Sequence, residues 1–199
     1  MNREAFLEAV HLLVALDREL VAITFNSLRF ALVSTAIVTS IGTPLGVAIA
    51  FHDFPGKRVL VSATHTLMGL PTVVVGLLVF SLLSRSGPLG DLGLLFSPAA
   101  VIIGQSVLAL PIIVSLVYSG LSRLDPELRE TLITLGASPI QQTFKILREG
   151  RIAVASAVLT AFGRVVGEVG TAMMLGGNIR WYTRTITTAI ALETQKGAF

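Results

Sequence analysis

The sequence contains no cysteine and few charged residues. The lack of cysteine excludes disulfides, thiolate catalysis and cysteine-ligated metal sites. The three histidines, His11, His52 and His65, lie in different segments, and none has a second histidine at the spacing of metal ligands. Charged residues make up 14% of the chain and apolar residues 53%, and the mean hydropathy is +0.80. This composition is too apolar for a soluble domain of 199 residues.

The apolar residues are gathered in four long runs, at residues 28–51, 59–83, 99–120 and 152–175. Each run has roughly 22–25 residues, enough for a helix to cross a hydrocarbon core about 30 Å thick. Only helices satisfy their own backbone hydrogen bonds in lipid at that length. We therefore expect an all-α, polytopic transmembrane protein in which residues 1–199 form a single membrane domain.

Both ends of the chain are too polar to span a membrane. Acidic residues interrupt residues 1–20, which excludes a cleavable signal peptide, and the apolar residues there fall on the spacing of an amphipathic interfacial helix. At the other end, glycines mark a turn that opens the segment 176–199. We expect a short helix at the outer membrane edge, with hydroxyl donors from Thr183, Thr185, Thr187 and Thr188.

Basic residues in the loops predict the orientation of the chain. Lys57 and Arg58 lie in the short loop 52–58, and five further basic residues lie in the long loop 121–151. The positive-inside rule places both loops in the cytoplasm and the N-terminus outside. Arg180, Arg184 and Lys196 fall on the outer side, against this bias.

Prolines lie near the middle of three of the four runs, at Pro44, Pro71 and Pro111. A proline inside a helix removes a hydrogen bond and kinks the helix. Kinks of this kind line pathways and form hinges, although prolines are also generally common in membrane helices. Gly42 and Gly46 in the first run, and Gly163 and Gly167 in the fourth, are four residues apart and predict tight helix packing within one chain or between two copies.

Arg164 and Glu168 are charged residues inside the fourth run. Their spacing of four residues puts them on one face of a continuous helix, where they can pair and lower the cost of desolvation. Two interpretations remain open: a structural ion pair in the protein interior, or a position beside a pathway or gate.

The long loop 121–151 predicts a helical hairpin between two membrane spans. Asp125 can cap a helix that begins at Pro126. Gly136 is suited to end this helix in a left-handed conformation. Ser138 can then open a second helix at Pro139, forming a capping box with the glutamine three residues on.

This hairpin resembles the cytoplasmic loop of binding-protein-dependent ABC transporter permeases, whose motif reads E-A-A-x3-G-x9-I-x-L-P. Glu130, Gly136 and Ile146 stand at the acidic, glycine and isoleucine positions in the correct register. The chain departs from the motif at both alanines and at the final leucine and proline. In the family this loop inserts into a groove on the ATPase subunit. The resemblance therefore implies ATPase coupling by Glu130, Gly136, Ala137, Ser138, Pro139 and Ile146.

The resemblance covers nearly the whole chain. The segments N-S-L-R-F-A-L-V-S-T, G-T-P-L-G-V-A-I-A-F and F-P-G-K-R resemble the oxyanion branch, which imports molybdate, tungstate and sulfate. G-L-P-T-V-V-V-G-L-L-V-F and the late T-R-T-I-T-T-A-I are most similar to tungstate permeases. Relatives of this type continue into one further apolar helix beyond the threonine-rich segment. Either the sequence is truncated after residue 199 or this member lacks that span, and we expect a truncation.

What the resemblance implies is an importer permease of the type I (MetI-like) fold in the plasma (inner) membrane. Its expected partners are a second permease copy, cytoplasmic ABC ATPase subunits and an extracytoplasmic oxyanion-binding protein that selects the anion, with no nucleic acid. ATP would be bound by the ATPase, and the permease itself would hold no cofactor or metal. Accordingly, the P-G-K-R at 55–58 lacks the rest of a phosphate-binding loop. We expect the translocation path or gate at Pro71, Thr72, Arg164, Glu168 and Thr171.

Two other functions compete with this interpretation. An intramembrane enzyme would need a nucleophile, a base or a metal cluster at membrane depth, and the sequence offers none at suitable spacing. A passive channel or membrane scaffold would leave the doubly capped hairpin without a purpose.

Overall fold

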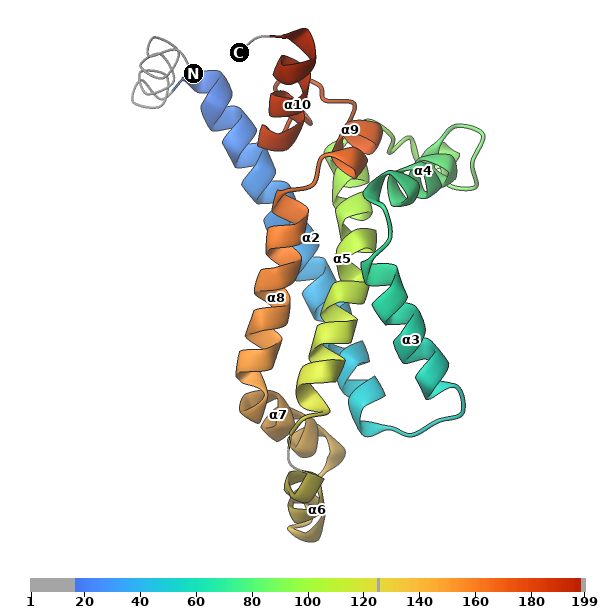
Figure 1. Ribbon diagram of the computed structural model, residues 1–199, viewed down its shortest axis with the longest axis vertical. Helices are drawn as coiled ribbons and strands as arrows, with labels where there is room; N and C mark the ends of the chain where they lie inside the picture. Colours follow the sequence, from blue (N-terminus) through green and yellow to red (C-terminus); the bar gives the residue numbers. More distant parts are fainter. Residues whose placement is uncertain (1–16, 125, 198–199) are drawn as a thin grey trace. The chain divides into compact units, whose positions relative to one another are not determined.

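The structure, a computed structural model, describes residues 17–124 and 126–197, and within them it is built from helices (Figure 1). Their order is α2 (Arg18–Phe51), α3 (Lys57–Met68), α4 (Thr72–Leu83), the 3-10 helix η1 (Gly90–Leu92), α5 (Pro98–Leu121), α6 (Pro126–Thr134), α7 (Pro139–Glu149), α8 (Arg151–Val166), α9 (Gly170–Gly176) and α10 (Ile186–Lys196). The described residues contain no strand, which confirms the all-α prediction. Asp125 and most of the predicted interfacial helix at residues 1–20 lie outside the described residues.

Within the described residues, two helices are long and apolar enough to cross a membrane on their own. They are α2, with 34 residues, and α5, with 24 residues. The pairs α3–α4 and α8–α9 meet the same criteria when each pair is taken together, as a broken span or a re-entrant loop. The runs predicted at 59–83 and 152–175 are therefore each interrupted.

The first interruption lies at Pro71, between α3 and α4. Pro71 has an extended backbone, with φ −60° and ψ 129°, and α4 begins at the next residue. A proline disfavours helical conformation for the residue before it and has no amide to donate, so α3 ends at Met68. By contrast, Pro44 and Pro111 lie inside the unbroken helices α2 and α5.

The second interruption carries no proline and was not predicted. The helix α8 ends at Val166 and α9 begins at Gly170, so Glu168 lies between them. The prediction that Arg164 and Glu168 share one helix face is therefore wrong. The reason is local: the Glu168 carboxylate accepts a hydrogen bond of 3.0 Å from the Thr171 amide, which caps the start of α9.

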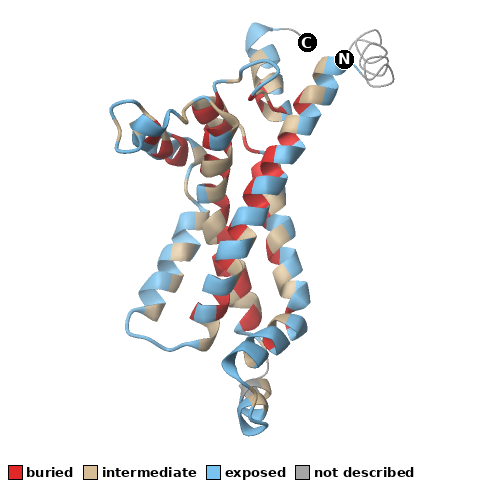
Figure 2. Ribbon diagram, turned by 180° about the vertical axis from the view of Figure 1, so that it is seen from behind, coloured by how far each residue is buried: buried red, intermediate tan, exposed pale blue. Residues whose placement is uncertain are grey.

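The helices form two compact units, which we describe separately. The described part of the first unit comprises residues 17–34, 71–105 and 166–197, and the second unit comprises residues 35–70 and 106–165 without residue 125. Figure 2 shows buried positions along the helices of both units and a largely exposed hairpin α6–α7.

In the first unit, α4 packs against α9. Gly76 of α4 permits this approach, since a Cβ there would lie 3.0 Å from the Met174 sulfur. The helix α5 also approaches α9 closely, because a Cβ at Gly104 of α5 would lie 2.3 Å from Leu175 Cδ1. Phe30, Val101 and Ala172 form a buried cluster beside them. Since lipid is as apolar as these side chains, close van der Waals packing is what stabilises such contacts in a membrane.

In the second unit, small residues of α2 pack against α5. A Cβ at Gly42 would lie 2.8 Å from Ile113 Cγ2, and one at Gly46 would lie 2.8 Å from Val117 Cβ. The predicted tight packing at Gly42 and Gly46 therefore occurs within the chain. At Gly163 it does not, because a Cβ there would meet no atom within 4 Å. Across the unit, a Cβ at Gly120 of α5 would lie 2.5 Å from the Ala153 Cβ of α8.

Candidate functional site

The hairpin of the second unit turns at Gly136, whose φ is +72°. The Gly136 amide donates to the Ile133 carbonyl at 2.9 Å, and the Ala137 amide donates to the Leu132 carbonyl at 3.0 Å. This pair of bonds is a Schellman motif, which satisfies the last carbonyls of α6. A Cβ at Gly136 would meet no atom within 4 Å, so backbone conformation alone requires glycine there.

The second helix of the hairpin begins with the predicted capping box. The Ser138 hydroxyl accepts a hydrogen bond from the Gln141 amide, and the Ser138 amide donates to the Gln141 side chain at 2.8 Å. Pro139 occupies the first turn of α7. The Gln142 side chain donates to the Ala137 carbonyl at 2.8 Å, which ties the turn to α7. Ala137, Ser138 and Pro139 thus fix the direction in which α7 leaves the turn.

The hairpin exposes large apolar side chains. Ile140 is 83% exposed and Phe144 is 71% exposed, and Leu135 at the turn is also exposed. Together with Pro139, Thr143 and Leu147, the residues Ile140 and Phe144 line a shallow groove of about 350 Å³. Apolar side chains gathered on a polar loop mark a surface that binds a partner. The 3–4 residue spacing of this stripe was visible in the sequence, but these residues were not singled out as coupling residues.

Ile146 lies on the opposite side of α7 and is 3% exposed. It lines a cavity of about 580 Å³ together with residues of α2, α5 and α6. Close by, a Cβ at Gly150 would lie 2.2 Å from Leu121 Cδ2, so the end of α7 packs tightly on α5. Ile146 therefore anchors the hairpin to the second unit.

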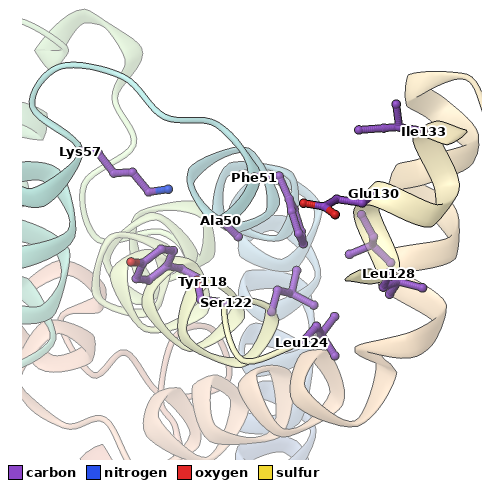
Figure 3. A pocket seen from close by; sticks show the side chains of 11 residues that line it. Ala50, Phe51, Lys57, Tyr118, Ser122, Leu124, Leu128, Glu130 and Ile133 are labelled. Carbon is purple, nitrogen blue, oxygen red and sulfur yellow. The ribbon is translucent and has the colours of Figure 1, made fainter. Parts of the chain in front are cut away.

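Figure 3 shows the polar side chains that reach this cavity. Glu130 of α6 and Lys57 at the start of α3 extend toward it from opposite sides, and the Tyr118 ring lies near Lys57. The Lys57 ammonium pairs with Asp53 at 3.0 Å. Glu130 thus lies at the root of the hairpin, whereas the exposed apolar stripe lies on α7.

The second candidate site lies in the first unit, where the starts of α4 and α9 meet. A Cβ at Gly170 would lie 2.9 Å from the Thr72 hydroxyl and 3.4 Å from a Glu168 carboxylate oxygen. The structure therefore brings together Pro71 and Thr72 with Glu168 and Thr171. Glu168 is 3% exposed and Thr171 is fully buried.

One hydroxyl at this junction is unusual. The buried Thr171 hydroxyl has no hydrogen-bond partner within the described part of the chain. A buried polar group without a partner is costly, and it is retained where something else can bind it. Arg164, the fifth residue predicted for this site, lies in the last turn of α8 and belongs to the second unit.

The threonine-rich segment forms the predicted short helix α10, but its hydroxyls are engaged within the protein. Thr187 donates to the Glu168 carbonyl at 2.7 Å, which ties α10 to the break before α9. Thr185 and Thr188 form the capping box of α10, and Thr183 donates to the Gly176 carbonyl. These threonines therefore hold the segment in place.

Comparison with known proteins bears directly on the hairpin and on the broken helices. The family model described as "Binding-protein-dependent transport system inner membrane component" matches residues 42–196. A probable anion ABC transporter permease protein of Haloferax volcanii is 42% identical over 183 residues, covering 89% of this chain and 79% of the relative.

Two further relatives are tungstate uptake system permease proteins. The one from Peptoclostridium acidaminophilum is 38% identical over 196 residues, covering 98% of this chain and 86% of the relative. The one from Campylobacter jejuni is 39% identical over 196 residues, covering 98% and 82%. With a family match that spans both candidate sites and similarity along nearly its full length, the chain belongs to the inner membrane components of binding-protein-dependent transport systems, the permeases of ABC transporters.

Proposed function

We propose that this chain is the membrane permease subunit of an ATP-driven importer of an oxyanion, with tungstate as the first candidate. The observation that carries the proposal is the rigid hairpin with its exposed apolar stripe on α7. Tungstate is supported by the two tungstate uptake permeases that resemble nearly the whole chain. In this proposal separate ATPase subunits bind and hydrolyse ATP, and the permease holds no cofactor of its own.

The hairpin is the proposed contact with the ATPase. Ile140 and Phe144 insert into an apolar groove of that subunit, where their burial contributes roughly 1.5–3 kcal/mol for each side chain. Gly136 sets the direction of α7, while Ile146 fastens α7 to the membrane helices. A rigid element anchored in this way can pass a movement of the ATPase to the second unit.

The junction of α4 and α9 is the proposed gate. Broken helices at membrane depth commonly carry the binding site of a transporter, because their ends free backbone groups to bind an ion. Thr72 and the unpartnered Thr171 hydroxyl can donate to an oxyanion there. Glu168 holds the start of α9 in place through its hydrogen bond from the Thr171 amide. Pro71, directly before Thr72, belongs to this proposed gate, while a role for Arg164 in the gate rests on the sequence alone.

The proposed assembly contains two permease copies, two ATPase subunits and an extracytoplasmic binding protein that selects the anion. It lies in the plasma (inner) membrane with the hairpin in the cytoplasm and the N-terminus outside. The basic loops support this orientation.

Co-purification with an ATPase subunit tests the hairpin contact. Detergent-solubilised wild-type permease, co-expressed with its ATPase subunit, is expected to retain that subunit through affinity purification. The double variant Ile140→Ala/Phe144→Ala is expected to lose it. Val59→Ala is the matched control, because Val59 is an exposed apolar residue of the second unit outside the hairpin. Equal retention by all three proteins would remove the hairpin from ATPase binding, whereas no retention even by the wild type would favour a passive channel or a scaffold.

A further inference from the structure

The segment between α9 and α10 exposes three consecutive residues, Arg180, Trp181 and Tyr182, which we call the Arg-Trp-Tyr tip. Trp181 is 56% exposed and Tyr182 is 49% exposed. The guanidinium carbon of Arg180 lies 5.4 Å from the centroid of the Trp181 ring, within cation–π range. Tryptophan, tyrosine and arginine are the residue types that contribute most of the binding energy in protein interfaces.

The backbone of the tip is strained. Trp181 has φ +67°, a left-handed conformation that bulky side chains rarely adopt. Burial of the side chain does not explain the strain, since most of the ring faces outward. Strained, exposed residues that the surrounding structure holds in place are typical of binding sites.

Hydrogen bonds from Thr183 and Asn26 hold the tip in this conformation. Thr183 is fully buried, donates to the Gly176 carbonyl and accepts from the Ile179 amide at 3.0 Å. From α2, the Asn26 side chain donates to the carbonyls of Tyr182 and Arg184 at 3.4 Å and 3.3 Å. The tip is therefore preorganised, so that a partner can bind it without first ordering the loop.

The charges at the tip favour an acidic partner. Glu19 of α2 pairs with both Arg180 and Arg184, so two guanidinium groups share one carboxylate. The Arg184 side chain is only 16% exposed, whereas that of Arg180 is 58% exposed. Arg180 can therefore bind a second carboxylate presented from outside.

Tryptophan and tyrosine also gather where a membrane meets water, so a lipid headgroup region is the competing partner. Membrane anchoring needs only an amphipathic ring at the right depth, and a left-handed backbone adds nothing to it. One face of the Trp181 ring is also covered by the Arg180 guanidinium. These two features favour a protein partner.

We infer that the Arg-Trp-Tyr tip is a docking point for an acidic surface of the extracytoplasmic binding protein. The inference rests on the proposed function, which supplies the partner and the topology. In that topology the hairpin lies in the cytoplasm, and the tip lies outside once α8 and α9 are taken together as one broken span. Arg180 pairs with a carboxylate of the binding protein, and the exposed face of Trp181 packs against its surface.

The test uses permease and ATPase subunits reconstituted in lipid nanodiscs. The tungstate-loaded cognate binding protein is titrated, and the concentration that gives half-maximal stimulation of ATP hydrolysis is measured. We expect Arg180→Glu and Trp181→Gly each to raise this concentration about tenfold or more. Trp181→Gly removes the ring and relieves the backbone strain, so it does not disturb the loop. Lys196→Glu is the matched control, because this lysine of the same unit has a side chain 55% exposed.

Three results would count against the docking point. First, the half-maximal concentration of binding protein could be the same for Arg180→Glu, Trp181→Gly and a wild type that is stimulated normally. This result would reject the docking role of the tip and leave the proposed function standing. Trp181 is the one tryptophan of the chain, so quenching of its fluorescence in vesicles of brominated lipid shows whether its ring lies in the membrane. Strong quenching together with unchanged titrations would identify a membrane anchor. A wild type that no oxyanion-loaded binding protein stimulates would reject the proposed function itself, and the docking point with it.

Discussion

At the scale of single residues, Gly136 and Glu168 show how local chemistry decides where the helices end. Gly136 stops α6 because its positive φ allows two amides to bond back to the last turn. Glu168 starts α9 because its carboxylate reaches the Thr171 amide. The role of Gly136 could be predicted, since a glycine after a helical pattern is a local signal. That of Glu168 could not, because a glutamate inside an apolar run equally suits an ion pair.

Substitution of Gly136 by valine should separate folding from coupling. Valine at φ +72° costs about 1–2 kcal/mol and changes the direction of α7. We expect Gly136→Val to reach the membrane at wild-type levels but to support less than roughly a tenth of wild-type transport, measured as uptake per permease. Gly56→Val is the control, since Gly56 also has a positive φ and open space but lies outside the hairpin. Equal transport by both variants would contradict the role given to Gly136.

Substitutions of Glu168 should distinguish a capping role from one that needs its charge. Glu168→Gln keeps an acceptor for the Thr171 amide, whereas Glu168→Leu removes it. We expect Glu168→Leu to lower the thermal midpoint of the detergent-solubilised permease by several degrees, reflecting about 1 kcal/mol, and Glu168→Gln to lower it much less. Equal losses in both variants would show that the charge, and not the cap, stabilises the break.

At the scale of helices, the hairpin was the most predictable element and the broken spans the least. Ser138 as the N-cap and Pro139 in the first turn are local signals for a helix start, so the sequence alone predicts where α7 begins. The interruption before α9 depends on contacts with α4 and α10, which come from distant parts of the chain. The burial of Ile146 likewise depends on α5, so its anchoring role could not be separated from surface coupling until the structure was known.

The capping box gives a prediction for α7. Ser138→Ala removes the side chain that accepts from the Gln141 amide, and loss of such a cap costs about 1 kcal/mol. We expect amide hydrogen exchange in the first turn of α7 to become about fivefold faster, because 1.4 kcal/mol corresponds to tenfold. Lys145→Ala, on the same helix but beyond its first turn, should leave this exchange unchanged. Unaltered exchange in Ser138→Ala would mean that other contacts define the start of α7.

The packing of α9 on its neighbours gives a second prediction at this scale. A methyl group at Gly104 would lie 2.3 Å from Leu175 Cδ1, and such overpacking costs about 1–3 kcal/mol. We expect Gly104→Ala to lower the thermal midpoint, and Leu175→Ala added to it to recover part of the loss. Gly163→Ala should have little effect, since a Cβ at Gly163 meets no atom within 4 Å. If both alanines behaved alike, the close approach of α9 would not limit stability.

At the scale of the whole molecule, each compact unit is assembled from segments that are distant in sequence. The first unit joins the start of α2, the α4 region and the chain from α9 onward, and it holds the proposed gate and the Arg-Trp-Tyr tip. The second unit holds the hairpin with its apolar stripe. Hydropathy predicted the apolar segments but not this division, because the division depends on packing between distant helices. The proposed gate and the proposed ATPase contact therefore lie on different units of one chain.

The central claim is that transport through this permease is driven by ATP hydrolysis on a partner. The most direct measurement is accumulation of tungstate in proteoliposomes that contain permease and ATPase subunits, with tungstate-loaded binding protein outside and ATP trapped inside. We expect tungstate to accumulate only when ATP, ATPase subunits and binding protein are all present. Tungstate entry through the permease without ATP or ATPase subunits would contradict the account and identify a passive channel.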